Sequence, residues 1–166
     1  MIQSEHPAVA VAESRVAEFG DGFGTDFTPT AVRVMDDAVA VSMDSTKARF
    51  IVIMEDIDGK WSAPSTLVGT TCPEGPRPER TPDYLPLKQM SRKHVPTLRT
   101  PDQSWFAIAG LAAKDAVEIS IVVDGREHRE PIGADGTAFA IVRIHEGQEP
   151  AAFVHTSDGR AVKATR

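Results

Sequence analysis

Ionisable side chains gather near the C-terminus, in a region where polar and apolar residues alternate. The segment REHREP, residues 126–131, has an ionisable side chain at every position except the last. Such side chains donate and accept hydrogen bonds, so they could form a polar site with residues of neighbouring strands. The candidate binding residues are Arg126, His128, Glu130, Arg143 and His145.

Three histidines, His128, His145 and His155, raise the alternative of a metal site, because three imidazoles can hold a metal ion. No short His-x-His or HExxH spacing prepares two of them as ligands. A solvated charged face is therefore the favoured interpretation. The sequence predicts no metal and no cofactor.

Motifs for covalent or hydrolytic catalysis are missing from the sequence, including GxSxG, SxxK, HExxH, CxxC and the Walker loop. Cys72 and His94 could act as nucleophile and base, but no sequence feature brings them together. Most carboxylates occupy turns, where Asp forms local hydrogen bonds. We therefore expect a protein without catalytic residues, and a non-enzymatic role is favoured.

Composition excludes several classes of protein. The 166 residues are 41% hydrophobic and 25% charged, which is typical of a globular domain. A net charge of -6 disfavours a nucleic-acid partner, and no apolar run reaches the roughly eighteen residues of a membrane span. Cys72 is the only cysteine, and the N-terminus lacks the features of a signal peptide. We expect a cytoplasmic protein with no membrane partner, and the abundant Ala and Arg suggest a bacterial source.

The elements that would position the candidate residues are mainly strands. In the N-terminal half, Asp36-Asp37 separates AVRVM from AVAVSM and predicts a hairpin. The run RFIVIMEDI is typical of a central strand buried on both faces. Asp58-Gly59 then turns the chain into KWSAPSTLV, where Pro64 indicates an edge strand or a break.

Two other segments are not typical strands. Residues 4–19 predict a short amphipathic helix, with Ser4 as a possible cap and Gly20 as a stop, although AVAVA also alternates like a strand. Residues 70–103 contain seven of the twelve prolines, a density that excludes helix and interior strand. This basic segment is predicted to be an extended crossover that could dock a partner.

The C-terminal half begins with the strand SWFAIAG and continues into a predicted antiparallel meander over residues 116–144. Within the meander, REHREP is charged on both faces, so we expect a solvated edge strand. Its register depends on the turn at Asp124-Gly125. A two-residue turn places Ile121 opposite His128, whereas a type I turn with a left-handed Gly125 places Ser120 there.

The predicted fold is an all-β antiparallel sandwich of immunoglobulin-like character with about eight or nine strands, a short N-terminal helix and a long proline-rich crossover. We expect a single domain over residues 1–166, with a β half at 1–69, a connector at 70–103 and a meander half at 104–166. The predicted core comprises Val32, Val34, Val41, Phe50, Val52, Ile53, Trp61, Trp105, Ile108, Ile119, Ile121, Phe139, Ile141 and Val154.

The favoured function is a non-catalytic protein–protein interaction or accessory module. Its partner would be another protein or a second copy of the chain, contacted through an edge strand or the proline-rich segment. The alternative is a small-molecule- or metal-binding β-domain with a polar site near His128, His145 and His155.

Overall fold

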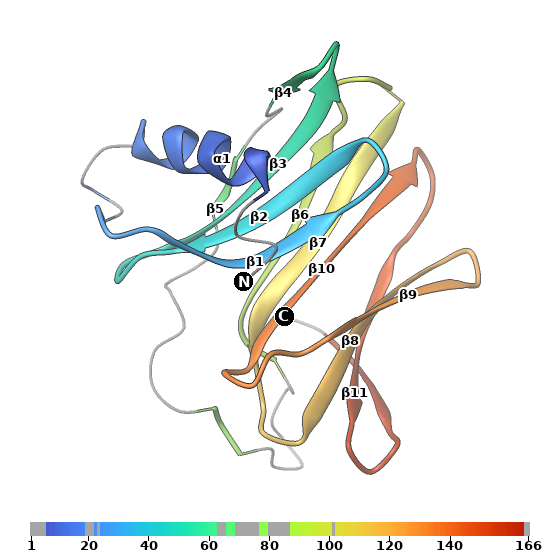
Figure 1. Cartoon of the computed structure of the whole chain (residues 1–166). Coiled ribbons are helices and arrows are strands. Elements are labelled where there is room, and N and C mark those ends of the chain that lie inside the picture. The colour runs from blue at the N-terminus through green and yellow to red at the C-terminus, as the bar shows by residue number, and fades with distance from the viewer. Residues whose placement is uncertain are drawn as a thin grey trace. The chain divides into compact units, whose positions relative to one another are not determined.

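The computed structural model describes residues 6–18, 22, 24–62, 66–68, 77–79, 87–100 and 102–164. These residues form one helix and twelve strands (Figure 1), in the order α1 (Pro7–Ala17), β1 (Thr28–Val34), β2 (Ala38–Asp44), β3 (Arg49–Ile57), β4 (Lys60–Ser62), β5 (Thr66–Val68), β6 (Leu87–Pro96), β7 (Gln103–Ala112), β8 (Ala116–Val123), β9 (Arg126–Pro131), β10 (Thr137–His145), β11 (Ala151–Thr156) and β12 (Ala161–Lys163).

The protein is mostly β, with one short helix, as the sequence predicts. The expected strand count is too low, because β4, β5 and β12 have three residues each and β6 lies inside the proline-rich segment. The chain divides into two compact units, residues 1–72 with 95–101 and residues 73–94 with 102–166. Each unit is described by itself below.

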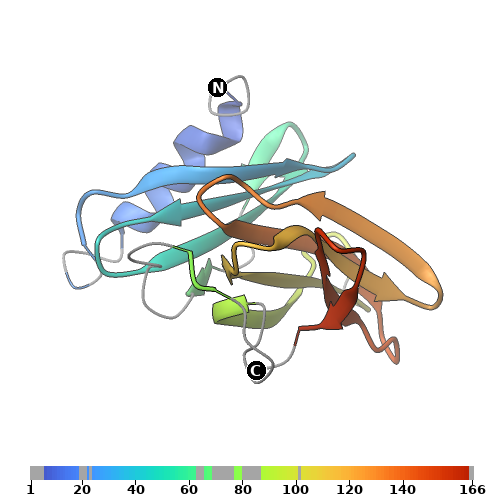
Figure 2. The ribbon, with the colours of Figure 1, turned by 90° about the horizontal axis from the view of Figure 1, so that it is seen from below.

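Helix α1 belongs to the first unit and lies across one face of its sheet (Figures 1 and 2). Pro7 occupies the first turn, where a missing N–H costs nothing, and the amide of Ala8 donates to Nδ1 of the N-cap His6 at 3.1 Å. The buried face consists of Ala8, Val9, Ala12 and Val16. The helical spacing of apolar residues predicts Val9, Ala12, Val16 and Phe19 for this face, and the first three are confirmed. Ser4, Phe19 and Gly20 lie outside the described residues.

The sheet of the first unit has the order β1-β2-β3-β4, and β5 also pairs with β3. The predicted hairpin around Asp36-Asp37 is confirmed as the β1–β2 pair. The prediction of a central β3 is also confirmed, because β3 pairs with β2 along one edge and with β4 and β5 along the other. Pro64, the predicted break, lies outside the described residues.

The core of this unit forms between α1 and the sheet, where Val41, Phe50 and Val52 pack against the buried helix face. Of the residues predicted for the core, Val34 is wrong: it is 59% exposed, because it is the last residue of the edge strand β1. Trp61 is half-buried at the margin of this core and meets His6 edge to face, with ring centroids 5.5 Å apart. The other predicted core residues are buried.

A buried carboxyl group ties residues 95–101 to the sheet of the first unit. Glu55 on β3 is fully buried, and its two oxygens accept hydrogen bonds from the backbone amides of Leu98 at 2.6 Å and Arg99 at 3.3 Å. Arg99 also lies 3.5 Å from the carboxylate of Asp37. The C-terminal end of the proline-rich segment is therefore part of this unit's packing.

The second unit has two sheets, with the orders β10-β7-β6 and β12-β11-β8-β9. Both sheets contribute to one core, which includes Phe106 and Ile108 from β7 and Ile119 and Ile121 from β8. The β7–β10 pair is antiparallel over nine residues, from Gln103 opposite His145 to Leu111 opposite Thr137.

The predicted meander is correct only for its first two strands. β8 pairs with β9, but β10 pairs with β7 in the other sheet. The physical reason is burial. β7 is buried over eight of its ten residues and β10 over five of its nine, so the two pair as largely buried strands, whereas a meander would have placed the charged β9 in the middle of a sheet.

The proline-rich segment contributes an edge strand, β6, to the second unit, consistent with the prediction that it contains no interior strand. Near its start, the guanidinium of Arg77 donates to three backbone carbonyls of the β7–β8 turn, those of Ala112, Ala113 and Ala116, at 3.3, 2.6 and 2.9 Å. The amide of Lys114 donates to the carbonyl of Pro78 at 3.0 Å. The described parts of the segment are therefore built into the fold.

Replacing Glu55 by Ala should destabilise the first unit by about 3 kcal/mol, because a hydrogen bond to a charged group contributes about 1.5–3 kcal/mol and two backbone amides lose their acceptor. Chemical denaturation measures the change. Glu13→Ala, at an exposed position of α1, is the control and should shift stability by less than about 0.5 kcal/mol. Equal stabilities for the two variants would contradict the anchoring role of Glu55.

Candidate functional site

The β8–β9 hairpin positions most of the candidate residues. Asp124 and Gly125 both have left-handed backbone conformations, with φ of 48° and 77°, and Val123 pairs with Arg126. This is a two-residue turn of the type that Asp-Gly favours. It selects the first of the two registers left open by the sequence, with Ile121 opposite His128.

This register decides which way each charge on β9 points. Residues opposite each other in a sheet share a face, so His128 lies on the same face as the core residue Ile121, and Glu130 lies on the same face as Ile119. Glu127 and Arg129 lie on the other face. Strand β9 is at the end of its sheet and is exposed at every residue except Glu130, as predicted for a solvated edge strand.

A polar cleft of about 590 Å³ adjoins this strand within the second unit. Four of the five candidate residues line it: Arg126 and His128 from β9, and Arg143 and His145 from β10. Glu130 is not part of the lining, but its Oε1 lies 2.9 Å from Nε2 of His128. The remaining lining residues are Ile121, Val123, Asp124, Glu127, Val142 and Gln148.

Two sets of interactions fix the positions of residues that line the cleft. The guanidinium carbon of Arg143 lies 4.5 Å from the ring centroid of the buried Trp105, within the range of a cation–π interaction. Gln148 bridges two turns, since its Nε2 donates to Oδ2 of Asp124 at 2.6 Å and its Oε1 accepts from the amide of His145 at 2.7 Å. The sequence indicates Asp124 only as a turn residue and gives no sign of Gln148 as a site residue, because turn residues carry no periodic signal.

The three histidines do not converge. His155 lies on β11 opposite Glu118 of β8, which puts it on the face away from His128. Its Nε2 lies 2.8 Å from Oγ of Ser120 and 3.2 Å from Oε1 of Glu127. The described part of the chain contains no group of three side chains arranged to hold a metal ion.

Ser120, His155 and Glu127 resemble a catalytic triad in residue types only. Both the serine and the glutamate contact the same nitrogen of His155, whereas a relay needs one partner on each ring nitrogen. Ser120 is also fully buried, so its hydroxyl cannot reach a substrate. The group is best understood as a polar network on the outer face of the sheet, where it links β9 to β8 and β11.

Arg129 extends this network. It donates to Glu127 at 2.8 Å and lies 3.4 Å from Glu118. The hydrogen bond and the charge of Arg129 lower the pKa of the Glu127 carboxyl, and Ser120 and His155 act in the same direction. Reciprocally, the hydrogen bond to Glu127 raises the pKa of the Arg129 guanidinium.

The backbone of β9 has one side without a partner strand among the described residues. The amide of Ile132 donates to the carbonyl of Val117, which fixes the pattern of the pair: even-numbered residues of β9 point their backbone groups toward β8. The N–H and C=O groups of Glu127 and Arg129 therefore point outward. Pro131 also points outward but has no N–H to donate.

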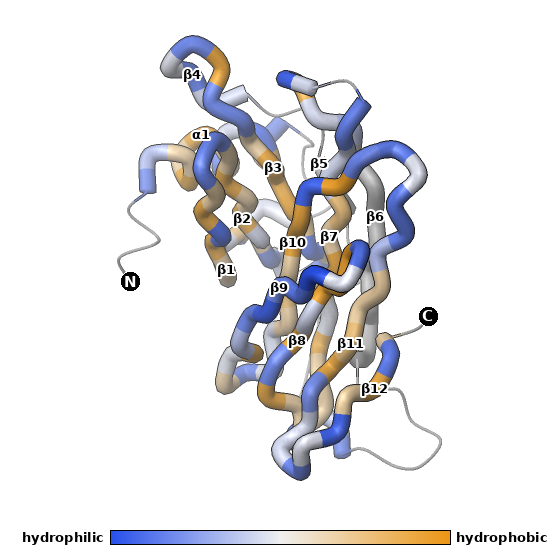
Figure 3. The backbone as a smooth tube through the Cα atoms, turned by 90° about the vertical axis from the view of Figure 1, so that its right-hand side faces the viewer, coloured by the Kyte–Doolittle hydropathy of each residue, from blue (hydrophilic) through white to orange (hydrophobic). Residues whose placement is uncertain are grey.

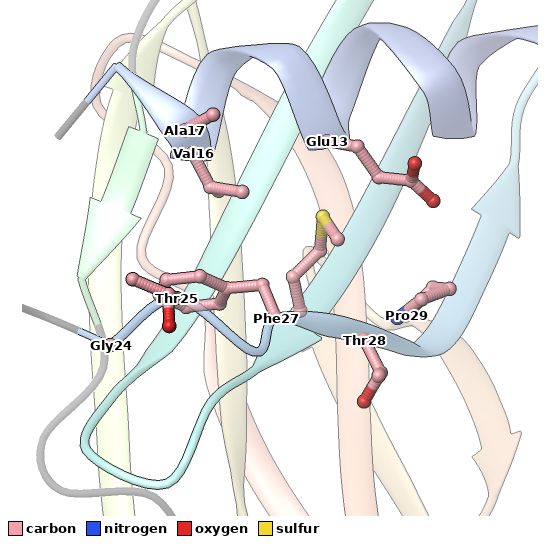
Figure 4. A pocket seen from close by; sticks show the side chains of 9 residues that line it. Glu13, Val16, Ala17, Gly24, Thr25, Phe27, Thr28 and Pro29 are labelled. Atoms are coloured by element: carbon pink, nitrogen blue, oxygen red, sulfur yellow. The ribbon is translucent and has the colours of Figure 1, made fainter. Parts of the chain in front are cut away.

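A second pocket, of about 520 Å³, lies in the first unit between α1 and the start of β1 (Figure 4). Val16, Phe27 and Met43 give it an apolar lining, and Glu13 is its only ionisable lining residue among those described. Phe27 stacks on Phe50, with ring centroids 5.1 Å apart. The sequence alone gives no sign of this pocket, because a pocket between a helix and a sheet depends on how the two pack.

In comparisons with known proteins, no protein-family model, no curated protein and no solved structure matches the chain. Among the described residues, no helix has the length and apolar character needed to span a membrane. Support for a function of this chain therefore comes from the geometry of its site.

Replacing Arg129 by Met should raise the pKa of Glu127 toward its ordinary value. A lowered carboxyl pKa stabilises the folded state above the ordinary pKa, and this stabilisation is lost as pH falls through the lowered pKa. The variant should therefore show a weaker loss of stability on acidification. NMR titration of the Glu127 carboxyl carbon measures the pKa, with Arg160→Met as the control. An unchanged Glu127 pKa would contradict the assignment.

Proposed function

We propose that the chain is a non-catalytic protein-interaction module that binds its partner along the exposed edge of β9. The second unit would be an immunoglobulin-like β-sandwich, and its edge strand would extend its sheet with a strand from the partner. This mode of binding uses backbone hydrogen bonds for affinity and side chains for specificity.

The order of the strands supports the immunoglobulin-like assignment. If β6, β7, β8, β9, β10, β11 and β12 are named A, B, C, C′, E, F and G, the two sheets read A-B-E and C′-C-F-G. Immunoglobulin-like sandwiches separate A, B and E from C, F and G in the same way, and the variable type adds C′ beside C. The shared core of the two sheets agrees with this layering.

The observation that carries the functional proposal is the outward backbone of Glu127 and Arg129 on an exposed strand. Most exposed edges are shortened, bulged or covered, because they invite pairing with other chains. β9 keeps six residues in regular register with β8. Its side chains are hydrophilic throughout (Figure 3), so it can stay exposed in water until a partner strand arrives.

The test uses Glu127→Pro, which removes one outward N–H without removing a hydrogen bond to β8. Affinity for the partner should fall about tenfold or more, since a lost backbone hydrogen bond adds to the steric clash of the ring. The measurement is quantitative affinity purification from the source organism, with a differently tagged second copy present. Glu149→Pro, at an exposed position outside the strands, is the matched control. If the Glu127→Pro variant retains every partner, the partners do not bind along the β9 edge.

A second candidate function is binding of a small anionic molecule in the cleft beside β9. The observation that favours it is the lining, where Arg126 and Arg143 meet His128 and His145 within one cavity of ligand size. Arg presents a planar fork of donors that suits carboxylates and phosphates.

Citrate and inorganic phosphate are the probes for this second function. Titration should shift the amide NMR signals of His145 and Gln148, and Arg126→Ala should weaken binding about tenfold by removing one charge-assisted contact. Arg160→Ala, at an exposed arginine outside the cleft, is the control. Shifts of equal size in both variants would show that the anions bind the surface non-specifically.

A further inference from the structure

The order of charges along β9 is self-complementary. The residues read Arg126, Glu127, His128, Arg129 and Glu130. When the segment is reversed end to end about His128, every positive position meets a negative one. A charged edge strand usually repels its own copies, but this order makes an antiparallel copy attractive.

We propose that the partner of the β9 edge is a second copy of this chain, which pairs antiparallel with β9 about a two-fold axis through His128. The inference rests on the proposed function and adds the identity of the partner and the register. Two four-stranded sheets would thereby join into one continuous sheet across the dimer.

The backbone pattern limits the possible registers. Only Glu127 and Arg129 present both an outward N–H and an outward C=O on β9, so symmetric pairing between these residues can be centred at Glu127, His128 or Arg129. Centring at Glu127 puts two glutamates opposite each other. Centring at Arg129 puts two arginines opposite each other. It also pairs Glu127 with Pro131, which has no N–H to donate to the partner strand.

Centring at His128 avoids both problems. Glu127 then faces Arg129 of the other copy in hydrogen-bonded pairs, and the two residues can exchange four backbone hydrogen bonds in the dimer as a whole. Arg126 faces Glu130 of the other copy in the adjacent pairs. All four charged cross-strand pairs are of opposite sign, and only the two His128 side chains meet a residue of their own kind.

The side chains needed for this contact are accessible. Arg126, Glu127, His128 and Arg129 are exposed, and the existing ion pairs of Glu127 and Arg129 are with each other, with Glu118 and with His155, all on the same sheet. The contact covers one short strand on each copy, which places it among small, transient interfaces. We therefore expect a reversible dimer that weakens as salt screens the exposed charges.

Charge reversal tests the register. Sedimentation velocity from about 10 μM to about 1 mM should show reversible dimerisation of the unmodified chain. Glu127→Arg and Arg129→Glu each replace two attractive pairs by two repulsive ones, and each should weaken dimerisation about tenfold or more. A mixture of the two variants should form a mixed dimer, and the double variant with both reversals should dimerise again.

Two controls guard against misfolding and general charge effects. Glu13→Arg and Arg160→Glu carry the same charge changes at exposed positions outside β9, and both should dimerise like the unmodified chain. Formation of the mixed dimer shows that both single variants are folded. A monomeric unmodified chain over the whole range, or unchanged dimerisation of both single variants, would overturn the inference.

Disulfide trapping measures directly which residues of the two β9 strands face each other in the dimer. In a Cys72→Ser background, His128→Cys should cross-link under mild oxidation, because facing residues of a non-hydrogen-bonded pair have Cα atoms about 4.5 Å apart. Glu127→Cys and Arg129→Cys should cross-link poorly, since each then lies diagonally from its own copy, at roughly 7–8 Å. Preferential cross-linking of either of these two would overturn the His128 register.

The outcomes separate this inference from the proposed function. If the chain stays monomeric while Glu127→Pro still loses another protein, the second copy is excluded and the interaction edge stands. If the unmodified chain is monomeric and Glu127→Pro loses nothing, both proposals fall. If the unmodified chain dimerises and both Glu127→Pro and the single reversals abolish it, both proposals are supported.

Discussion

The left-handed pair Asp124-Gly125 is the constraint on which the site depends. Because this turn contains two residues, Val123 faces Arg126, and every later residue of β9 is assigned a partner and a face. A slip of one residue would exchange the two faces of the strand. It would also exchange the backbone groups that point toward β8 with those that point outward. The contents of the cleft, the network around His155 and the outward edge all follow from this one turn.

The position of β9 at the end of a sheet follows from the cost of burying charge. A strand with ionisable side chains on both faces cannot lie between two apolar strands without leaving charges out of water. β10, which is mostly buried, therefore pairs with β7, and β9 keeps a neighbour on one side only. In the dimer that we propose, the charges that keep β9 solvated also select the strand that pairs with it.

The described parts of the proline-rich segment have structural roles that its composition does not reveal. Its excess of basic residues suggests a docking surface for an acidic partner. In the fold, Arg77 satisfies three carbonyls of the β7–β8 turn, while Glu55 receives the amides of Leu98 and Arg99. These groups satisfy backbone atoms that have no partner in a regular sheet. Arg77 and the amides of Leu98 and Arg99 therefore act within the protein, and the interaction surface that we propose lies on β9.

Local chemistry in the sequence was enough to predict the helix, the hairpins, the exposed β9 and most of the core, because periodicity and turn residues act over a few positions. It could not choose between two registers at Asp124-Gly125, and this choice needed the backbone angles of the turn. Periodicity also gives the face of a residue only within its own strand. The separation of His155 from His128, the pairing of β10 with β7, the exposure of Val34 and the partners of Glu55 depend on contacts between distant segments. Those contacts form because particular apolar faces of the strands and the helix pack together, and only the tertiary structure shows which faces do so.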